Sequence, residues 1–289
     1  MTSPPIWTSL TPEEHEFQYN PQNAVPDYER YRAHRAPAND AAKTLTRHES
    51  VAYGDHPLHT LDIYPAGDRA PVHLFLHGGY WRAQDKANFA FIAGTLVPRG
   101  ITTVIANYEL CPASTLDAVA ASAIAAMDFI ARKIGDFGGD PAAITLSGHS
   151  AGAHLGAEII AYDWAREGFT APVKGATLIS GIYDPTPARL TTVNAELNLT
   201  EALIARRNVE ARSPLLSCPV ALFVGGKEPW HWIDQSYRYS HHLRRNGLDP
   251  AVHVLPGFNH FDILDEYLDA DSLLVRSILG HAKRAKAAS

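Results

Sequence analysis

The chain has 289 residues, of which 46% are hydrophobic, so it can bury the core of one α/β domain with insertions. Its formal net charge of −6 is modest, and no run of Lys and Arg could follow a phosphate backbone, so nucleic acid is not an expected partner. No apolar run could span a membrane, and residues 1–17 lack the basic start and apolar stretch of a signal peptide, so no membrane partner is expected.

The amino-terminal part of the chain predicts an arm followed by a hairpin. Residues 1–50 are rich in proline, asparagine, tyrosine and charge, which favours an irregular arm around the core, with one short helix at residues 28–34. Residues 51–54 and 58–64 alternate apolar and polar side chains on either side of a turn. This pattern predicts an antiparallel hairpin.

Strands and helices alternate in the rest of the chain. Buried strands are predicted at residues 72–76, 102–106, 143–147, 174–179, 220–224 and 251–255. Helices are predicted at residues 89–96, 116–134 and 153–160, the second with one apolar face. The order predicts an α/β fold with a mostly parallel sheet and helices on both faces, forming a single domain over residues 1–289. Residues 184–214 offer no strand and are expected to form a small lid, whereas the tail at 281–289 is expected to fray.

The sequence GHSAG at residues 148–152 lies between a predicted strand and a predicted helix. Glycines on both sides of Ser150 allow the sharp strand-to-helix turn of a nucleophile elbow. The amide of Ala151 and the positive end of the helix dipole would then face the Ser150 hydroxyl. Without that role, Ser150 would only cap the helix.

The sequence HGGYW at residues 77–81 directly follows another predicted strand. Its glycines let backbone amides approach a bound carbonyl group without obstruction from side chains. We therefore expect an oxyanion hole formed by the amides of Gly78, Gly79 and Ala151, each worth about 3 kcal/mol when aimed correctly.

The base and the acid are expected after the last two strands. His260 follows the last strand and Glu228 the one before it, which gives the order serine, acid, histidine of an α/β-hydrolase. In this prediction Ser150 is the nucleophile, His260 the general base and Glu228 the acid that orients the imidazole. Asp234 could supply the acid instead, and His260 could be an ordinary loop histidine.

Other residues near these loops receive structural predictions. His77 and His149 are expected to brace their loops rather than to act as bases. No pair of histidines combines with a carboxylate at metal-ligand spacing, so no metal and no other cofactor is expected. Aromatic residues flank the predicted loops and form either a substrate wall or ordinary core: Tyr80, Trp81, Tyr183, Trp230, Trp232 and Phe258.

The HGGYW loop, the GHSAG elbow and the sequence NHF at residues 259–261 together resemble the serine-dependent arylformamidases, or kynurenine formamidases, within the α/β-hydrolases. Residues 19–21, 25–27 and 53–64 resemble the amino-terminal region of that family, so the likeness covers most of the chain. Glu228 stands where the family commonly has an aspartate. The resemblance implies hydrolysis of an N-formyl aromatic amine such as N-formylkynurenine, a small-molecule substrate, through an acyl-enzyme and without a cofactor.

Two alternatives stay open at this point. Carboxylesterases use the same machinery on short-chain esters, so the chain could be a general carboxylesterase. It could also be a non-catalytic relative of the hydrolases that binds a ligand. Two cysteines among apolar neighbours or beside proline, at positions 111 and 218, favour a reducing, cytoplasmic location, and assembly into a homo-oligomer is left open.

Overall fold

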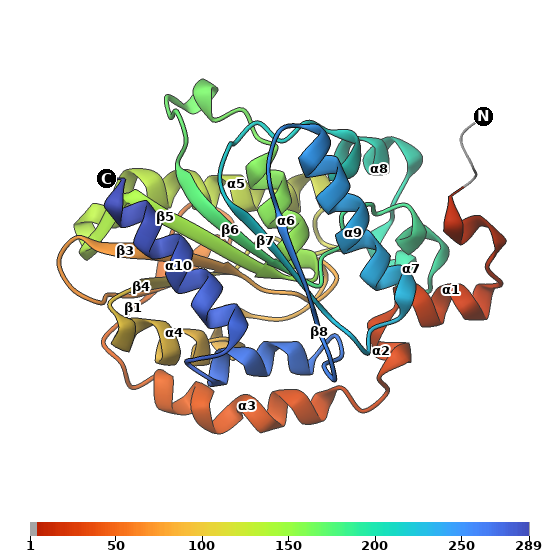
Figure 1. Cartoon of the computed structure of the whole chain (residues 1–289), viewed down its shortest axis with the longest axis horizontal. Helices are drawn as coiled ribbons and strands as arrows, with labels where there is room; N and C mark the ends of the chain where they lie inside the picture. Colours follow the sequence, from red (N-terminus) through yellow and green to blue (C-terminus); the bar gives the residue numbers. More distant parts are fainter. Residues whose placement is uncertain (1–4, 289) are drawn as a thin grey trace.

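The computed structural model describes residues 5–288, which are built around one eight-stranded sheet with the strand order β1-β2-β4-β3-β5-β6-β7-β8 (Figure 1). The strands are β1 His48–Ala52, β2 Thr60–Tyr64, β3 Ala70–Leu76, β4 Thr102–Ala106, β5 Gly139–His149, β6 Val173–Ile179, β7 Val220–Gly225 and β8 Ala251–Leu255.

The pairing of the strands confirms the predicted sheet. β1 pairs with β2 and β2 with β4 in antiparallel fashion, and all other neighbouring strands are parallel. The central strand β3 is buried almost throughout, because its side chains meet helices on both faces of the sheet.

Helices form a layer on each face of the sheet (Figure 1). One layer packs around an apolar cluster that includes side chains of α5, α6 and α9, and the other around a cluster with side chains of α3, α4 and α10. The helices are α1 Pro12–Tyr19, α2 Pro21–Ala24, α3 Glu29–Ala42, α4 Phe91–Leu96, α5 Leu116–Lys133, α6 Ala151–Ile160, α7 Asn194–Leu197, α8 Glu201–Arg207, α9 Trp230–Arg245 and α10 Leu273–Ala287.

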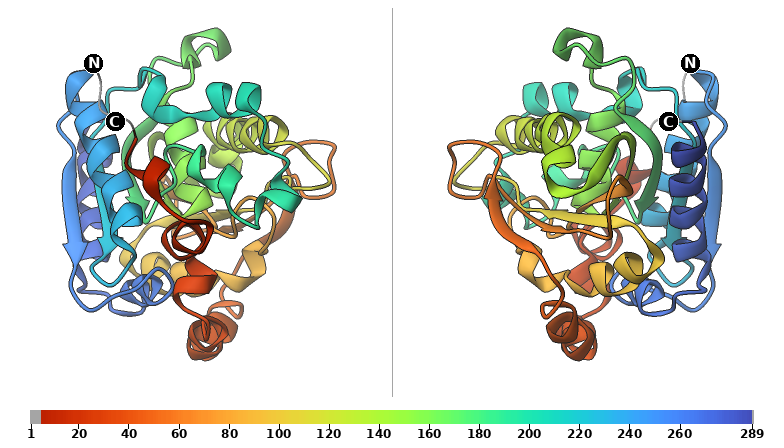
Figure 2. Two further views of the ribbon diagram at one scale, coloured as in Figure 1. Left: turned by 90° about the vertical axis from the view of Figure 1, so that its right-hand side faces the viewer. Right: turned by 90° about the vertical axis from the view of Figure 1, so that its left-hand side faces the viewer.

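The prediction of an irregular arm is wrong for residues 5–50, because most of this segment is helical, and residues 1–4 lie outside the described residues. α1 begins with a capping box in which Thr11 and Glu14 each accept a hydrogen bond from the other's amide. α3 is twice as long as the predicted helix, and Figure 2 shows it outside α4 at one edge of the molecule. Arg35 and Asn39 lie on its buried side, so the sequence lacks the apolar period that would reveal the helix.

The carboxyl terminus also differs from its prediction. Residues 281–287 do not fray, because α10 continues to Ala287 and buries His281, Ala282 and Ala285 against the sheet. Within residues 5–288, no helix is long and apolar enough to cross a membrane.

The segment at residues 184–214 contains no strand, in agreement with the sequence. It folds into α7, α8 and two short 3₁₀ helices, Pro187–Leu190 and Val209–Ala211. The first of these packs against α1, and the backbone amide of Thr192 donates to Glu16 of that helix. The segment therefore contacts the arm, and its role as a lid stays a prediction.

Candidate active site

Ser150 lies at the sharp turn between β5 and α6. Its backbone has φ +56° and ψ −116°, a conformation that a residue other than glycine adopts only under constraint. A Cβ on Gly148 would lie 2.1 Å from the carbonyl oxygen of Gly152, and one on Gly152 would lie 2.0 Å from that of Leu76. Both glycines are therefore required for the turn that presents the serine.

The loop after β8 carries His260, and the turn after β7 carries Glu228. Nδ1 of His260 lies 2.7 Å from Oε2 of Glu228, whose side chain is fully buried. The other carboxylate oxygen accepts hydrogen bonds from the Gly225 amide at 2.7 Å and from the Ser180 hydroxyl at 2.5 Å. This carboxylate is fixed from three sides and holds the imidazole ring in one orientation.

Asp234 lies elsewhere. Its side chain is 26% exposed on α9 and accepts a hydrogen bond from Arg238 at 2.8 Å. Of the two candidate acids, Glu228 is therefore the one that the structure brings to His260. Because Glu228 occupies Nδ1, Nε2 is the ring nitrogen left for Ser150.

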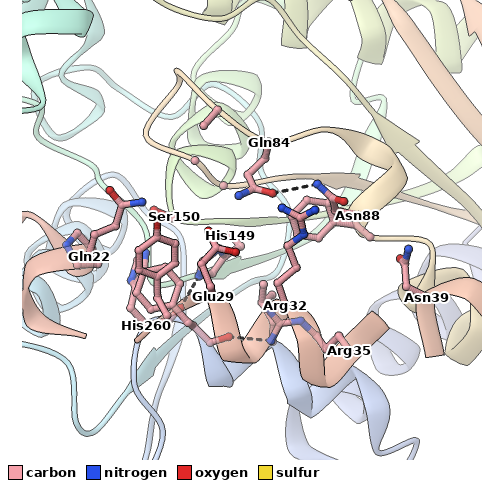
Figure 3. Close-up of a pocket in the computed structure, with 18 of the residues that line it drawn as sticks. Gln22, Glu29, Arg32, Arg35, Asn39, Gln84, Asn88, His149, Ser150 and His260 are labelled. Atoms are coloured by element: carbon pink, nitrogen blue, oxygen red, sulfur yellow. Dashed lines mark hydrogen bonds between the residues drawn. The ribbon is translucent and has the colours of Figure 1, made fainter. Parts of the chain in front are cut away.

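Ser150 and His260 line the same pocket, whose volume is about 280 Å³ (Figure 3). Across residues 5–288, no hydrogen bond of the Ser150 hydroxyl is formed, to His260 or to any other group. Catalytic hydrogen bonds of this kind commonly tighten only when substrate is bound. The imidazole packs against the edge of Trp232, with the ring centres 4.8 Å apart.

The glycine-rich loop after β3 lies against the serine. A Cβ on Gly78 would lie 3.2 Å from Cβ of Ser150, and Gly79 has φ +112°. In the described part of the chain, the amides of Gly78, Gly79 and Ala151 donate no hydrogen bond, so they are free to bind an oxyanion.

His77 braces this glycine-rich loop through contacts with its backbone and with two aromatic rings. Its ring stacks between Phe89 and Tyr108, and Nδ1 donates to the carbonyl oxygen of Gly78 at 2.8 Å. Burial lowers the pKa of His77, which keeps the imidazole neutral. The Tyr108 hydroxyl adds a hydrogen bond to the His77 carbonyl oxygen at 2.5 Å.

His149 braces the opposite side. Nε2 of His149 lies 2.8 Å from the carbonyl oxygen of His260, and burial together with the neighbouring His260 lowers its pKa well below the usual value. The neutral ring donates through Nε2 to the His260 backbone, so this nitrogen is not available as a base for Ser150. The geometry of His77 and His149 thus fits bracing roles.

The predicted substrate wall needs correction, because only Tyr80 of the six aromatic residues lines the pocket. Trp81 is fully buried and packs against His154 in the core. Tyr183 is also buried, stacked on Tyr239 with ring centres 4.1 Å apart. The other three, Trp230, Trp232 and Phe258, also lie outside the pocket lining.

Trp230 is 56% exposed at the start of α9, where its ring contacts His231. Phe258 lines a separate, shallow surface pocket beside Tyr31. An aromatic side chain near a strand end can point into the core, the pocket or solvent, and the sequence pattern does not distinguish these directions.

The pocket wall contains residues that the sequence did not single out. The arm contributes Gln22, Glu29, Arg32, Arg35 and Asn39, which Figure 3 shows around the pocket together with Ser150 and His149. Ser180, the partner of Glu228, was also missed. Its position directly after the strand β6, at the edge where the other site residues lie, is the signal that could have found it.

A group of three residues, located outside this pocket, could hold a metal ion. The ligand atoms of His56, His59 and Glu109 lie within 4.8 Å of one another, although the sequence showed no such spacing because Glu109 is distant along the chain. Nε2 of His59 is 3.0 Å from Glu109 and 3.1 Å from the Ser122 hydroxyl, so these groups already satisfy one another.

Comparisons with known proteins agree with this geometry. The family defined by the α/β hydrolase fold matches residues 73–263. The kynurenine formamidase of Danio rerio is 30% identical over 289 residues, covering 94% of this chain and 97% of that protein. The chain belongs to the kynurenine formamidase family of α/β hydrolases. The Salmo salar member is 31% identical over 84% of this chain and 83% of its own length.

Solved structures show how widely the α/β hydrolase fold of this family is shared. A proposed thioesterase of Silicibacter sp. has a TM-score of 0.79 at 24% identity and covers 90% of this chain and 97% of its own. An esterase B of Lactobacillus has a TM-score of 0.70 at 17% identity, with coverages of 91% and 96%. These structures show the fold, and the family membership shows that the protein is a hydrolase.

Proposed function

We propose that this enzyme hydrolyses the N-formyl amide of N-formylkynurenine, or of a closely similar aryl formamide, to the free arylamine and formate. The observation that carries the proposal is the pocket lined by both Ser150 and His260, with Glu228 bonded to the far nitrogen of the imidazole. The relatives of this chain that are named kynurenine formamidases support this choice of substrate.

The geometry supports a two-step route through a formyl-enzyme. Nε2 of His260 takes the Ser150 proton as Oγ attacks the formyl carbon, and the free amides of the oxyanion hole receive the negative charge on the carbonyl oxygen. The C–N bond then breaks, and the arylamine leaves with the proton from His260. A water molecule, deprotonated by His260, hydrolyses the formyl ester of Ser150 and releases formate.

A general carboxylesterase is the second candidate, favoured by the fold shared with solved esterases. A non-catalytic binding protein has less support, because every residue needed for the chemistry is present. A substrate panel under identical conditions separates the three readings, using N-formylkynurenine, neutral formanilide and p-nitrophenyl acetate.

The proposal predicts the highest kcat/KM for N-formylkynurenine, and a loss on the order of 10⁴-fold or more in Ser150→Ala with every substrate. If p-nitrophenyl acetate were turned over much faster than both formamides, the proposal would fail and the enzyme would be a general carboxylesterase. Absence of turnover on all three would favour the binding protein.

The remaining proposals concern the enzyme's setting. The two cysteines are free and buried, which supports a reducing location such as the cytoplasm. Residues 1–289 are proposed to fold as a single domain in which residues 184–214 act as a lid. Assembly into a homo-oligomer stays a prediction.

A further inference from the structure

We infer that α3 carries a binding subsite for the α-amino-acid end of the substrate, in which Arg32 binds the carboxylate and Glu29 the ammonium group. The inference rests on the proposed function and deepens it, because it selects zwitterionic aryl formamides over neutral ones. It concerns binding and assigns no step of the chemistry to either residue.

The position of the two side chains is the first observation. Glu29 and Arg32 both line the pocket that contains Ser150 and His260. They are three residues apart on α3, which puts them on neighbouring positions of one helix face. In Figure 3 the Arg32 side chain extends from α3 into the pocket toward Gln84 and Asn88, away from the side where Ser150 and His260 lie.

The second observation is that these two charged side chains have no partner in the part of the chain that the structure describes. Other charged side chains of the pocket wall are paired: Arg35 with Asp265 at 2.7 Å, Lys43 with Asp40 at 3.2 Å, and Arg82 with Glu196. By contrast, among residues 5–288 neither Arg32 nor Glu29 forms a hydrogen bond or an ion pair. Each is free to bind a ligand group of opposite charge.

The charge of the wall is the third observation. Four cationic and two anionic side chains line the pocket, and because three of the cations are paired with carboxylates, Arg32 is the cation of the wall that has no partner among residues 5–288. An unpaired cation in a pocket attracts anionic groups. Near Arg32 the wall is polar, because Nδ2 of Asn88 donates to Oε1 of Gln84 at 3.2 Å.

The chemistry of the side chains identifies the ligand. A guanidinium binds a carboxylate through two parallel hydrogen bonds, a geometry that lysine does not reproduce. An adjacent carboxylate of the protein suits an ammonium group bonded to the same carbon. N-Formylkynurenine carries both groups on its tail, whereas a formanilide or a simple ester carries neither.

The test compares two substrates with the same scissile bond, N-formylkynurenine and formanilide, in the full-length enzyme and in Arg32→Ala, Arg32→Lys and Glu29→Gln. Arg32→Ala should lower kcat/KM for N-formylkynurenine about 10- to 100-fold, mainly through a higher KM, because a charged hydrogen bond is lost from ground state and transition state alike. It should change kcat/KM for formanilide less than about twofold. Arg32→Lys should be intermediate, and Glu29→Gln should show a smaller loss on N-formylkynurenine alone.

Arg30→Ala is the matched control, since Arg30 lies on the same helix but outside the pocket, beside Tyr31 and Asp27. It should leave both substrates unchanged. Equal losses of Arg32→Ala on both substrates, or no loss on either, would overturn the subsite and leave the proposed function standing. If the wild-type enzyme cleaved neither formamide, the proposed function would fail and the subsite with it.

Discussion

At the scale of single residues, the acid is the most constrained group of the site. Glu228 accepts hydrogen bonds from the imidazole of His260, the Ser180 hydroxyl and the Gly225 amide. A carboxylate held in this way fixes the tautomer of the imidazole and stabilises the imidazolium that forms during catalysis.

Replacing Glu228 by glutamine should therefore lower kcat for N-formylkynurenine by on the order of 10³- to 10⁴-fold with little change in KM, because the ring loses its counter-charge and its tautomer. Asp234→Asn, which removes a charge of the same sign from α9, should stay within about twofold. Steady-state kinetics on both variants decides between the two acids. A comparable loss in Asp234→Asn would contradict the assignment.

The catalytic residues predicted from the sequence all follow parallel strands. Ser150, Glu228 and His260 come together because the carboxyl ends of β5, β7 and β8 meet at one edge of the sheet. Trp81 and Tyr183 also follow strands but turn into the core, since burial of their rings against neighbours decides their direction. Those neighbours are distant along the chain, and no local pattern reveals them.

At the scale of elements, α3 is a structural part of the site. Arg35 donates to the carbonyl oxygen of Phe261 at 3.0 Å and to Asp265 at 2.7 Å, next to His260. Asn39 donates to the carbonyl oxygen of Ala87 at 2.8 Å, in the segment before α4. The arm helix thus ties together the two sides of the pocket that it covers.

Arg35→Ala should lower the free energy of unfolding by about 1–3 kcal/mol, because it leaves Asp265 and a backbone carbonyl without their partner. The exposed Arg30 provides the comparison, since its replacement by alanine should cost less than about 1 kcal/mol. Urea denaturation of both variants measures the difference. Equal stabilities would show that α3 is not anchored through Arg35.

The arm is also where prediction from sequence fell short. A surface helix is recognised by apolar residues at three- and four-residue spacing, but the buried positions of α3 include Arg35 and Asn39, and Pro37 lies within it. The partners of Arg35, which are Phe261 and Asp265, lie more than 200 residues away along the chain. The strands needed no such partners to be recognised, because the parallel strands contain short, mostly apolar runs and the hairpin alternates apolar and polar residues.

At the scale of the whole molecule, buried histidines couple the stability of the fold to pH. His73 lies inside the sheet, where Nδ1 meets the Thr145 hydroxyl at 2.9 Å and Nε2 the Ser147 hydroxyl at 2.7 Å. Burial lowers the pKa of His73 to about 3, and burial lowers that of His281 on α10 to about 4.

In the unfolded chain both histidines would take up a proton near pH 6.5, whereas in the fold they stay neutral until much lower pH. The unfolded state therefore binds more protons between these values, and stability falls as the pH drops below 6.5. Each histidine should lower the free energy of unfolding by about 2 kcal/mol when the pH falls from 7.5 to 5.

Urea unfolding at the two pH values measures this loss, and His73→Gln should reduce the difference while the exposed His241→Gln leaves it unchanged. The same stability at both pH values in the wild-type protein would contradict the coupling.

Every proposed step of catalysis depends on Ser150 being the nucleophile of the pocket. The most direct measurement is covalent labelling of the native enzyme with a fluorophosphonate, followed by peptide mass analysis and by residual activity on N-formylkynurenine. We predict one phosphonyl group on Ser150, loss of activity in proportion to labelling, and no label at this peptide in Ser150→Ala. Full activity after complete labelling of Ser150, or inactivation through another residue while Ser150 stays unmodified, would contradict the account.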